Sequence, residues 1–313
     1  MPEETKQTSD AAESSVERTP VNAASEAVDK KVQQVVANIR NLPTPPMVFT
    51  QIQKAINSET ASANDVARIL SEDPSMSAKV LKMTNSAFYG LAREIDSVQQ
   101  AVLIIGFEAV KNLVLSASVM DMFKGNKIDP DFQDCFWRHS LATAMASRMF
   151  ARSVKSRGAV DPEAAFSAGL LHDIGKLVVA CFMPEEHNGI QAQMKLEPNE
   201  PDFVVEETAL GYTHQRLGAA LGVNWNLSRH LVDAIAYHHE PRESGDGDYL
   251  PHAIYFGNYI AKTAFADDFA GRVIAEPEPK LMAFMDVDSA KLESFVAALR
   301  EEYSKAQTFL SMA

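Results

Sequence analysis

Apolar residues recur every three or four positions along most of this chain, the spacing expected of helices that bury one face. Two early segments show it plainly: Val48, Ile52, Ala55 and Ile56, and then Val66, Ile69 and Leu70. Strict alternation of apolar and polar residues, which is typical of half-buried strands, is almost absent. The pattern therefore predicts an all-α protein, a helical bundle with essentially no sheet.

Helix-start signals divide this pattern into segments. Asp73-Pro74 and Asp161-Pro162 each place a capping carboxylate before a first-turn proline, and Ser62 is followed three residues later by Asp65. Residues 107–123 are predicted to form a long helix that joins two helical halves. Residues 275–279 interrupt the pattern and are predicted to be a linker.

We expect four parts in the chain. Residues 1–27 are polar and poor in bulky apolar side chains, which predicts a disordered tail. Residues 28–125 are expected to form an N-terminal helical half, residues 126–270 a second helical half, and residues 271–313 the linker and a C-terminal helix. That helix is expected to pack on the core rather than dock a partner, through an apolar stripe of Leu292, Phe295, Val296, Leu299, Tyr303 and Leu310.

Residues 85–90 allow two interpretations. The favoured one is a helix C-terminus closed by Gly90, with Phe88 and Tyr89 in the core. The alternative is a loop that binds phosphate or another ligand.

The adjacent pair His172-Asp173 lies in an otherwise nearly all-apolar stretch, residues 165–180. A helix that is apolar on every side is buried, and burying an imidazole beside a carboxylate is costly without compensation. A bound cation would compensate, because it needs a neutral His and an ionised Asp. The alternative is a structural pair joined by a hydrogen bond.

Four further histidines lie on apolar helix faces, namely His139, His214, His238 and His239. Any one of them alone is more often hydrogen-bonded to a backbone carbonyl than bound to a metal. Ligand-type residues on four separate helices instead favour a shared site, and imidazole with carboxylate suits Fe, Mn or Zn. His187 and His230 are assigned to the surface.

These residues carry a resemblance to a known family. The order of the histidines, together with Leu171-His-Asp-Ile-Gly-Lys176, resembles the HD phosphohydrolase superfamily, and His-His-Glu at 238–240 resembles its HD-GYP branch. Upstream motifs resemble the helical N-terminal half of the HDOD domain, the HD-related output domain: Leu42-Pro43, Asp73-Pro74, Asn85 to Gly90 and Ile95 to Gly106. The similarity runs from about Leu42 to about Phe265, and the chain is identified as a member of the HDOD family.

The resemblance implies one or two divalent metal ions, with His139, His172 and Asp173 holding one and His214, His238 and His239 helping to hold a second. Asp173 and Lys176 are then the candidate catalytic residues, because a lysine at this position resembles a phosphate contact in the HD-GYP enzymes. The alternative for Lys176 is a side chain that extends to solvent. Gly175 is expected to allow a close helix crossing.

Two departures from the enzymes stand out. Enzymatic HD domains have a further Asp ligand where this chain offers Asn258, a neutral and weaker ligand. The Gly-Tyr-Pro triplet of the HD-GYP phosphodiesterases is missing after His239, where residues 242–248 follow instead.

Composition indicates the cellular compartment and the class of partner. Two cysteines, Cys135 and Cys181, form no disulfide framework, and the polar N-terminus shows no signal-peptide pattern, so we expect a bacterial-type cytoplasmic protein. The longest apolar run, Leu177–Met183, is far shorter than the roughly 18 residues of a membrane span. The net charge of −13 argues against nucleic acid as the main partner.

Two functions remain open. The first is a signalling output module that binds a partner protein or a small phosphorylated ligand, and it is favoured by Asn258 and the missing triplet. The second is a metal-dependent phosphohydrolase of the phosphodiesterase type, in which cations activate water and neutralise phosphoryl charge. No sensor or receiver domain is recognised, so the input is expected from another protein or a ligand.

Overall fold

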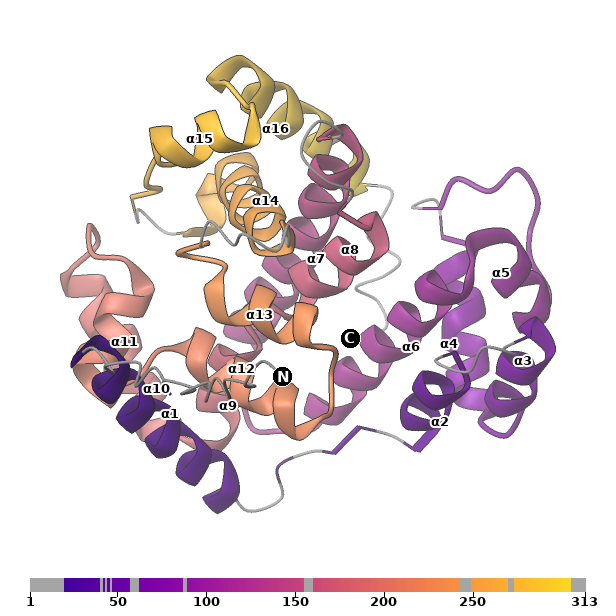
Figure 1. Cartoon of the computed structure of the whole chain (residues 1–313), viewed down its shortest axis with the longest axis horizontal. Coiled ribbons are helices and arrows are strands. Elements are labelled where there is room, and N and C mark those ends of the chain that lie inside the picture. The colour runs from indigo at the N-terminus through magenta and orange to yellow at the C-terminus, as the bar shows by residue number, and fades with distance from the viewer. Residues whose placement is uncertain are drawn as a thin grey trace, which may run out of the picture.

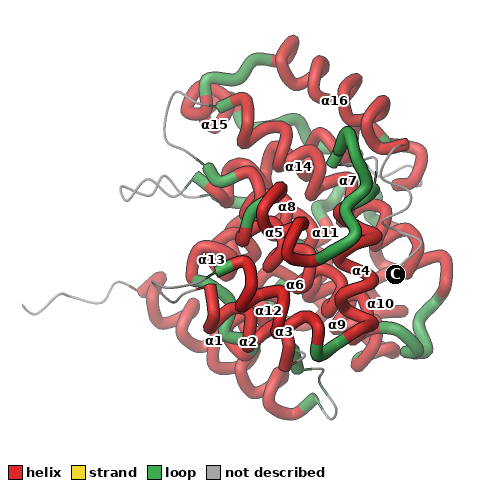
Figure 2. Tube along the Cα trace, turned by 90° about the vertical axis from the view of Figure 1, so that its right-hand side faces the viewer, coloured by secondary structure: helices red, strands yellow, loops and turns green. Residues whose placement is uncertain are grey.

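Every regular element of the described chain is a helix, and none is a strand (Figure 2). The structure is a computed structural model that describes residues 20–39, 42, 44–45, 47–56, 62–86, 89–154, 160–241, 249–269 and 273–304. The predicted all-α class is confirmed. Four parts of the sequence for which predictions were made lie outside the described residues: residues 1–19 of the expected tail, Phe88, residues 242–248 and Leu310.

A first lobe contains the helices α2 to α6 (Figure 1). The predicted caps start two of them: Ser62 and Asp65 form a reciprocal capping box on α3, and Asp73 caps α4 ahead of Pro74. The helices are α2 (Met47–Ile56), α3 (Ala63–Ser71), α4 (Pro74–Thr84), α5 (Val98–Ile105) and α6 (Phe107–Phe123). The long helix predicted at 107–123 is therefore present with the expected bounds.

The segment after α4 differs from the prediction. The helix ends at Thr84 with Asn85 as its C-cap, so Gly90, at φ +60°, belongs to a later turn. The Asn85 side chain instead fastens this region: its Nδ2 donates to the Ile95 carbonyl and its Oδ1 accepts from the Ile95 amide, both at 2.7 Å. These bonds give the segment a structural role.

The second lobe contains α7 to α14, with α6 connecting it to the first lobe (Figure 1). The Asn112 side chain of α6 donates to the Glu163 carbonyl of α8 at 3.0 Å, and one hydrophobic core runs through both lobes. The helices are α7 (Pro130–Ser153), α8 (Pro162–Leu171), α9 (Ile174–Phe182), α10 (Pro184–Leu196), α11 (Asp202–Leu210), α12 (His214–Asn224), α13 (Arg229–Tyr237) and α14 (Leu250–Ala264), with a short 3-10 helix at Ala266–Phe269.

Helix α1 (Pro20–Asn38) changes two of the predicted boundaries. It begins seven residues before the expected end of the tail at residue 27. It also packs on α12 of the second lobe rather than on the first lobe (Figure 1). Val32 is buried in this contact, Lys31 Nζ donates to the Leu210 carbonyl at 2.7 Å, and Asp29 pairs with Arg216 at 3.2 Å. The expected N-terminal half is therefore divided in space after its first helix.

Two helices follow the predicted linker, where one was expected. They are α15 (Pro279–Met285) and α16 (Ser289–Tyr303), and α16 packs on α7 and α14. Leu292, Val296 and Leu299 are buried, as expected for a helix packed on the core.

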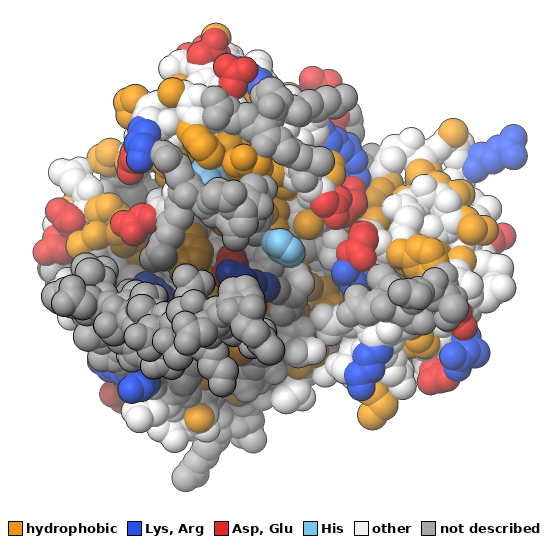
Figure 3. Space-filling model, in the orientation of Figure 1, with side chains coloured by type: hydrophobic (Ala, Val, Ile, Leu, Met, Phe, Trp, Pro, Cys, Tyr) orange, Lys and Arg blue, Asp and Glu red, His pale blue; other side chains and the backbone are white. Residues whose placement is uncertain are grey.

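One stretch, Pro162–Phe182, is apolar and long enough for a membrane span by composition and length, but 83% of its apolar window is buried inside the protein. It is the core of the second lobe rather than a lipid-facing segment. On the face drawn in Figure 3, the described Lys and Arg side chains are scattered and acidic side chains lie between them.

Candidate metal centre

The His172-Asp173 pair lies at a break between two helices, which corrects the expectation of one continuous buried helix. Helix α8 ends at Leu171, His172 is its C-cap, and Asp173, at φ −97° and ψ 10°, precedes α9. Both side chains are buried, at 0% and 2% exposure. The break turns them toward the ends of α12 and α13, so that residues far apart in sequence meet there.

A glycine permits this meeting of helices. A Cβ atom on Gly175 would lie 2.1 Å from the His214 carbonyl oxygen and 3.0 Å from the Gly218 nitrogen. Only a residue without a side chain therefore lets α9 approach the start of α12 so closely. The expected close crossing at Gly175 is confirmed, and it brings His214 to Asp173.

We expect Gly175→Ala to destabilise the protein by about 1–3 kcal/mol or more, because the clash is with backbone that cannot rotate away. Gly189→Ala is the matched control: Gly189 is also helical, has nothing within 4 Å of its virtual Cβ, and should gain about 0.5–1 kcal/mol. Urea unfolding of both variants measures the difference. Equal stability of the two variants would refute the close crossing.

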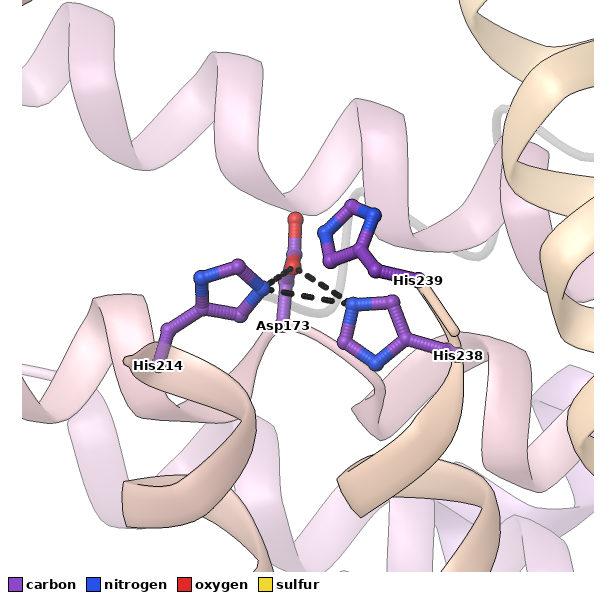
Figure 4. Close-up of side chains that lie close together, drawn as sticks. All are labelled: Asp173, His214, His238 and His239. Atoms are coloured by element: carbon purple, nitrogen blue, oxygen red, sulfur yellow. Dashed lines mark hydrogen bonds and ion pairs between the residues drawn. The ribbon is translucent and has the colours of Figure 1, made fainter. Parts of the chain in front are cut away.

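Asp173 is at the centre of the cluster (Figure 4). Its Oδ1 lies 3.0 Å from His214 Nε2 and 3.6 Å from His238 Nε2. Its Oδ2 lies 3.4 Å from His172 Nε2, 3.6 Å from His139 Nε2 and 3.0 Å from Lys176 Nζ. One carboxylate therefore faces two groups of imidazoles, one through each oxygen.

Three of the imidazoles are oriented by partners behind them. His172 Nδ1 bonds to the Gly169 carbonyl at 2.7 Å, and His238 Nδ1 to the Ile235 carbonyl at 2.8 Å. His214 Nδ1 lies 2.5 Å from Glu206 Oε2. Each Nδ1 is used by its partner, so Nε2 is the nitrogen that faces Asp173, and it can bind a metal when the ring is neutral, as in protein metal sites where an acceptor behind the ring orients the ligand.

Burial keeps most of these rings neutral. It lowers the pKa of His238 to about 3 and, with His172 nearby, holds the pKa of His139 well below its usual value. Burial and His238 do the same to the pKa of His239. Burial alone would raise the pKa of Asp173, but His172 and Lys176 outweigh it and hold that pKa well below its usual value. Neutral imidazoles and an ionised carboxylate are the forms that bind metal.

These shifts predict acid sensitivity of the metal-free protein. Below a pH of about 6.5, histidines of the unfolded chain take up protons that buried His139, His238 and His239 do not. Because the unfolded state then binds more protons than the folded state, the free energy of unfolding decreases as the pH is lowered. His214, whose pKa Glu206 raises against the effect of burial, acts oppositely but is one group against three. The urea midpoint at about pH 5 should lie below that at about pH 7.5. A higher midpoint in acid would contradict these neutral rings.

The donor set fits a divalent metal ion. Two groups have ligand atoms within 4.8 Å of one another: Asp173 with His214, His238 and His239, and Asp173 with His139 and His172. Two ligands at ~2.1 Å from one ion are at most about 4 Å apart, which is close to these separations. All six histidine and aspartate ligands proposed from the sequence are therefore brought together.

Asn258 lies on α14 beside this cluster. It is 5% exposed, and its Oδ1 has no hydrogen-bond partner among the described residues. It lines a cavity of about 300 Å³ together with His238 and His239. A buried amide oxygen without a partner is costly, so a ligand or ion in this cavity would compensate it.

Residues 273–278, which overlap the linker predicted at 275–279, form one wall of that cavity. Tyr259 donates its hydroxyl to Glu276 at 2.8 Å, and the Glu278 amide donates to the Tyr255 hydroxyl at 3.0 Å. Lys262, Asp202 and Phe203 also line the cavity. We call it the polar cavity.

Lys176 does not extend to solvent, which was the alternative for this side chain. Its Nζ lies 3.0 Å from Asp173 and 3.1 Å from Asp202, and these carboxylates with Glu206 raise its pKa against the effect of burial. It is a fixed positive charge beside Asp173.

Sequence reasoning missed two residues of the site, Asp202 and Glu206. Both lie on α11, one turn apart, and Glu206 is 4% exposed. One local signal could have indicated that Glu206 is buried: it directly follows the apolar residue Val205, which is buried on the same short helix. His187, predicted at the surface, is half-buried with its ring 4.5 Å from that of Phe132, while His230 is exposed as predicted.

Asp202 and Glu206 share one side of α11, and both point to the cluster, toward Lys176 and His214. Only the tertiary fold shows that this side of the helix faces the site.

An all-α lobe with a His-Asp pair at a helix break and imidazoles from three further helices defines an HD-type protein. A family model described as the HDOD domain matches residues 42–241, which is more than half of the chain. The chain therefore belongs to the HDOD domain family, and the resemblance found in its motifs is confirmed.

The chain is similar to one curated protein in sequence and to two solved structures in fold. An uncharacterized protein of Treponema pallidum is 24% identical over 289 residues, which are 89% of this chain and 53% of that protein. A crystal structure from Marinobacter aquaeolei, described as a candidate signal transduction protein, has a TM-score of 0.76 at 22% identity and covers 93% of this chain and 66% of its own. A candidate phosphohydrolase from Shewanella amazonensis has a TM-score of 0.66 at 23% identity, covering 90% and 97%.

The chain spans about half the length of the Treponema relative and about two thirds of the Marinobacter protein. At these identities the solved structures show the fold of the chain and not its activity.

Proposed function

We propose that this protein is an HDOD signalling module whose second lobe binds one or two divalent metal ions, Fe, Mn or Zn, and which acts by binding a protein or a small phosphorylated ligand. One observation carries the proposal. Imidazoles from α7, the α8–α9 break, α12 and the end of α13 face a single buried carboxylate, Asp173, and three of them are oriented by acceptors behind the ring.

The small negative charge of the ligand set favours binding over catalytic turnover. Asp173 is the one carboxylate in both candidate ligand groups of the described chain, and Lys176 already lies against its Oδ2. Asn258 adds no negative charge. A pair of divalent ions would therefore be poorly neutralised, and we expect weak retention at one position. When bound, such ions would supply Lewis acidity and an activated water.

The roles of the protein residues follow. Asn258 would be a weak further ligand from the polar cavity. Lys176 would attract a phosphoryl oxygen as a point charge. Glu206 would keep His214 in the tautomer that presents Nε2. The neutral ligands around Asp173 would be His139, His172, His214, His238 and His239.

The second candidate function is a metal-dependent phosphohydrolase of the HD or HD-GYP type. It is favoured by the complete set of imidazoles and by the polar cavity of about 300 Å³ that opens beside them. The Shewanella protein is described as a candidate phosphohydrolase, which supports the same class. The regulatory function is preferred for two reasons. The neutral amide at 258 adds no negative charge to hold a second metal ion, and the positive charge of Lys176 is already paired with Asp173 and Asp202.

The proposal includes the class of partner and the cellular location of the protein. A net charge of −13 and the scattered basic side chains in Figure 3 favour a protein or small-molecule partner over nucleic acid. The burial of Pro162–Phe182 and the two free cysteines fit a bacterial cytoplasmic protein.

The test compares binding with turnover in one metal-loaded sample. Calorimetry with cyclic di-GMP should show binding that is lost after treatment with a chelator, while hydrolysis of cyclic di-GMP and of bis(p-nitrophenyl) phosphate should be slow or absent. Turnover near the enzyme-typical ~10 per second would favour the hydrolase instead. Binding that is unchanged by the chelator would contradict a role for the metal.

A further inference from the structure

A second cavity reaches the cluster from another side. It has a volume of about 220 Å³ and lies between the faces of α7, α9, α10 and α11. Its inner end is formed by His139, Asp173 and Lys176. Its other walls are mainly apolar, with Phe132, Phe136, Val179, Ile190 and Met194. We call it the apolar slot.

One wall of the slot follows α7. Phe132, Phe136 and His139 follow one another at helical spacing on the face that lines it, and seven residues of helix span about 10 Å. Half-buried Phe132 and His187, with ring centroids 4.5 Å apart at 71°, mark its outer end. An apolar body about as long as two helical turns would therefore fit between these rings and the cluster.

The inner end is charged. Lys176 Nζ lies between Asp173 and Asp202, and Glu206 also lines the slot, so three carboxylates face one ammonium group. An anion would be repelled there unless a cation were bound at Asp173. With a divalent ion on Asp173 the formal charges at the inner end cancel, so an anion is no longer repelled and a carboxylate can bind the ion directly, beside the imidazole of His139.

The two cavities differ in chemistry. The polar cavity is lined by carboxylates, tyrosines and Lys262 together with apolar residues such as Val273, whereas the walls of the slot away from its charged inner end are mainly aromatic and aliphatic. Asp202 lines both, and its ion pair with Lys176 lies between them. The candidate metal cluster is therefore reached by a polar ligand from one cavity and by an apolar ligand from the other.

We infer that the apolar slot binds a small amphipathic monocarboxylate, with its apolar body between α7 and α10 and its carboxylate directed to the metal held at Asp173. This inference rests on the proposed metal site. It adds a second ligand class, distinct from a phosphorylated ligand, through which the module could respond to an apolar metabolite.

A series of acetate, butyrate, hexanoate and octanoate tests the slot by calorimetry on the Mn²⁺-loaded full chain. Affinity should rise about three- to fourfold for each buried methylene, because apolar burial contributes about 0.8 kcal/mol per methylene. Gln191→Trp should weaken octanoate binding at least about tenfold by filling the slot, since Gln191 lines it. Gln193→Trp, the same change at an exposed position of α10, should bind octanoate as the wild type does.

Metal content is measured in every sample, which separates this inference from the proposed function. Chelator-treated protein should bind octanoate much more weakly than the loaded protein. If the protein takes up metal but octanoate binds no better than acetate, or if Gln191→Trp has no effect, the slot inference is wrong and the metal site stands. If the protein takes up no metal, both fail.

Discussion

The double substitution His172→Ala with Asp173→Ala is expected to remove all bound metal and to lower the melting temperature of the metal-loaded protein by roughly 10 °C. Asp173 belongs to both candidate ligand groups, so its loss affects each of them. A ligand present at about a thousand times its dissociation constant stabilises by about 4 kcal/mol, and that contribution disappears with the site. Elemental analysis and thermal unfolding, with and without chelator, measure both effects.

His230→Ala is the control for this variant, because His230 is exposed and lies outside both ligand groups. It should keep the metal content and melting temperature of the wild type. The double variant should also lose the difference in melting temperature between loaded and chelator-treated protein. Retention of wild-type metal by the double variant would show that the ions bind elsewhere.

Asn258→Asp is expected to increase metal retention at least about tenfold and to raise phosphodiesterase turnover. A unit charge at ~4 Å contributes about 4 kcal/mol at an effective dielectric of about 20, reduced by the cost of burying the new carboxylate. Without metal the same change should destabilise the protein, because position 258 is 5% exposed. Metal content after dialysis, and hydrolysis of cyclic dinucleotides with added Mn²⁺ or Fe²⁺, report the result.

Asn224→Asp is the matched control, since it makes the same change at an exposed residue at the end of α12. It should leave metal content and turnover unchanged, with at most a small loss of stability from a carboxylate at a helix C-terminus. Gain of metal and activity together in Asn258→Asp would identify position 258 as the place where the site was relaxed. No gain of either would assign Asn258 a structural role instead.

Much of the architecture could be predicted because helix signals are local. Ser62 with Asp65, Asp73 before Pro74 and Asp161 before Pro162 cap their helices as expected, since capping depends on a few neighbouring residues. The position of α1 could not be predicted in this way. Its contact with α12 joins Asp29 to Arg216 across most of the chain, and no local pattern encodes such a pairing.

The histidines of the site could be predicted for a different reason. Ligand-type side chains such as His139 and His214 on apolar faces need compensation wherever they are buried, so their number already indicated a shared site. The break at His172-Asp173 was missed because apolar residues on both sides resemble one long buried helix. Glu206 was missed because a single glutamate on a short helix is usually exposed, and its contact with His214 depends on the tertiary fold.

The most direct test of a retained metal centre is elemental analysis of freshly purified wild-type protein, before any metal is added. We expect Fe, Mn or Zn in stoichiometric amount, lost on treatment with a chelator and restored by adding the same ion. Protein that is folded and free of all three metals, and that takes up none on addition, would show that Asp173 and its histidines form a structural cluster.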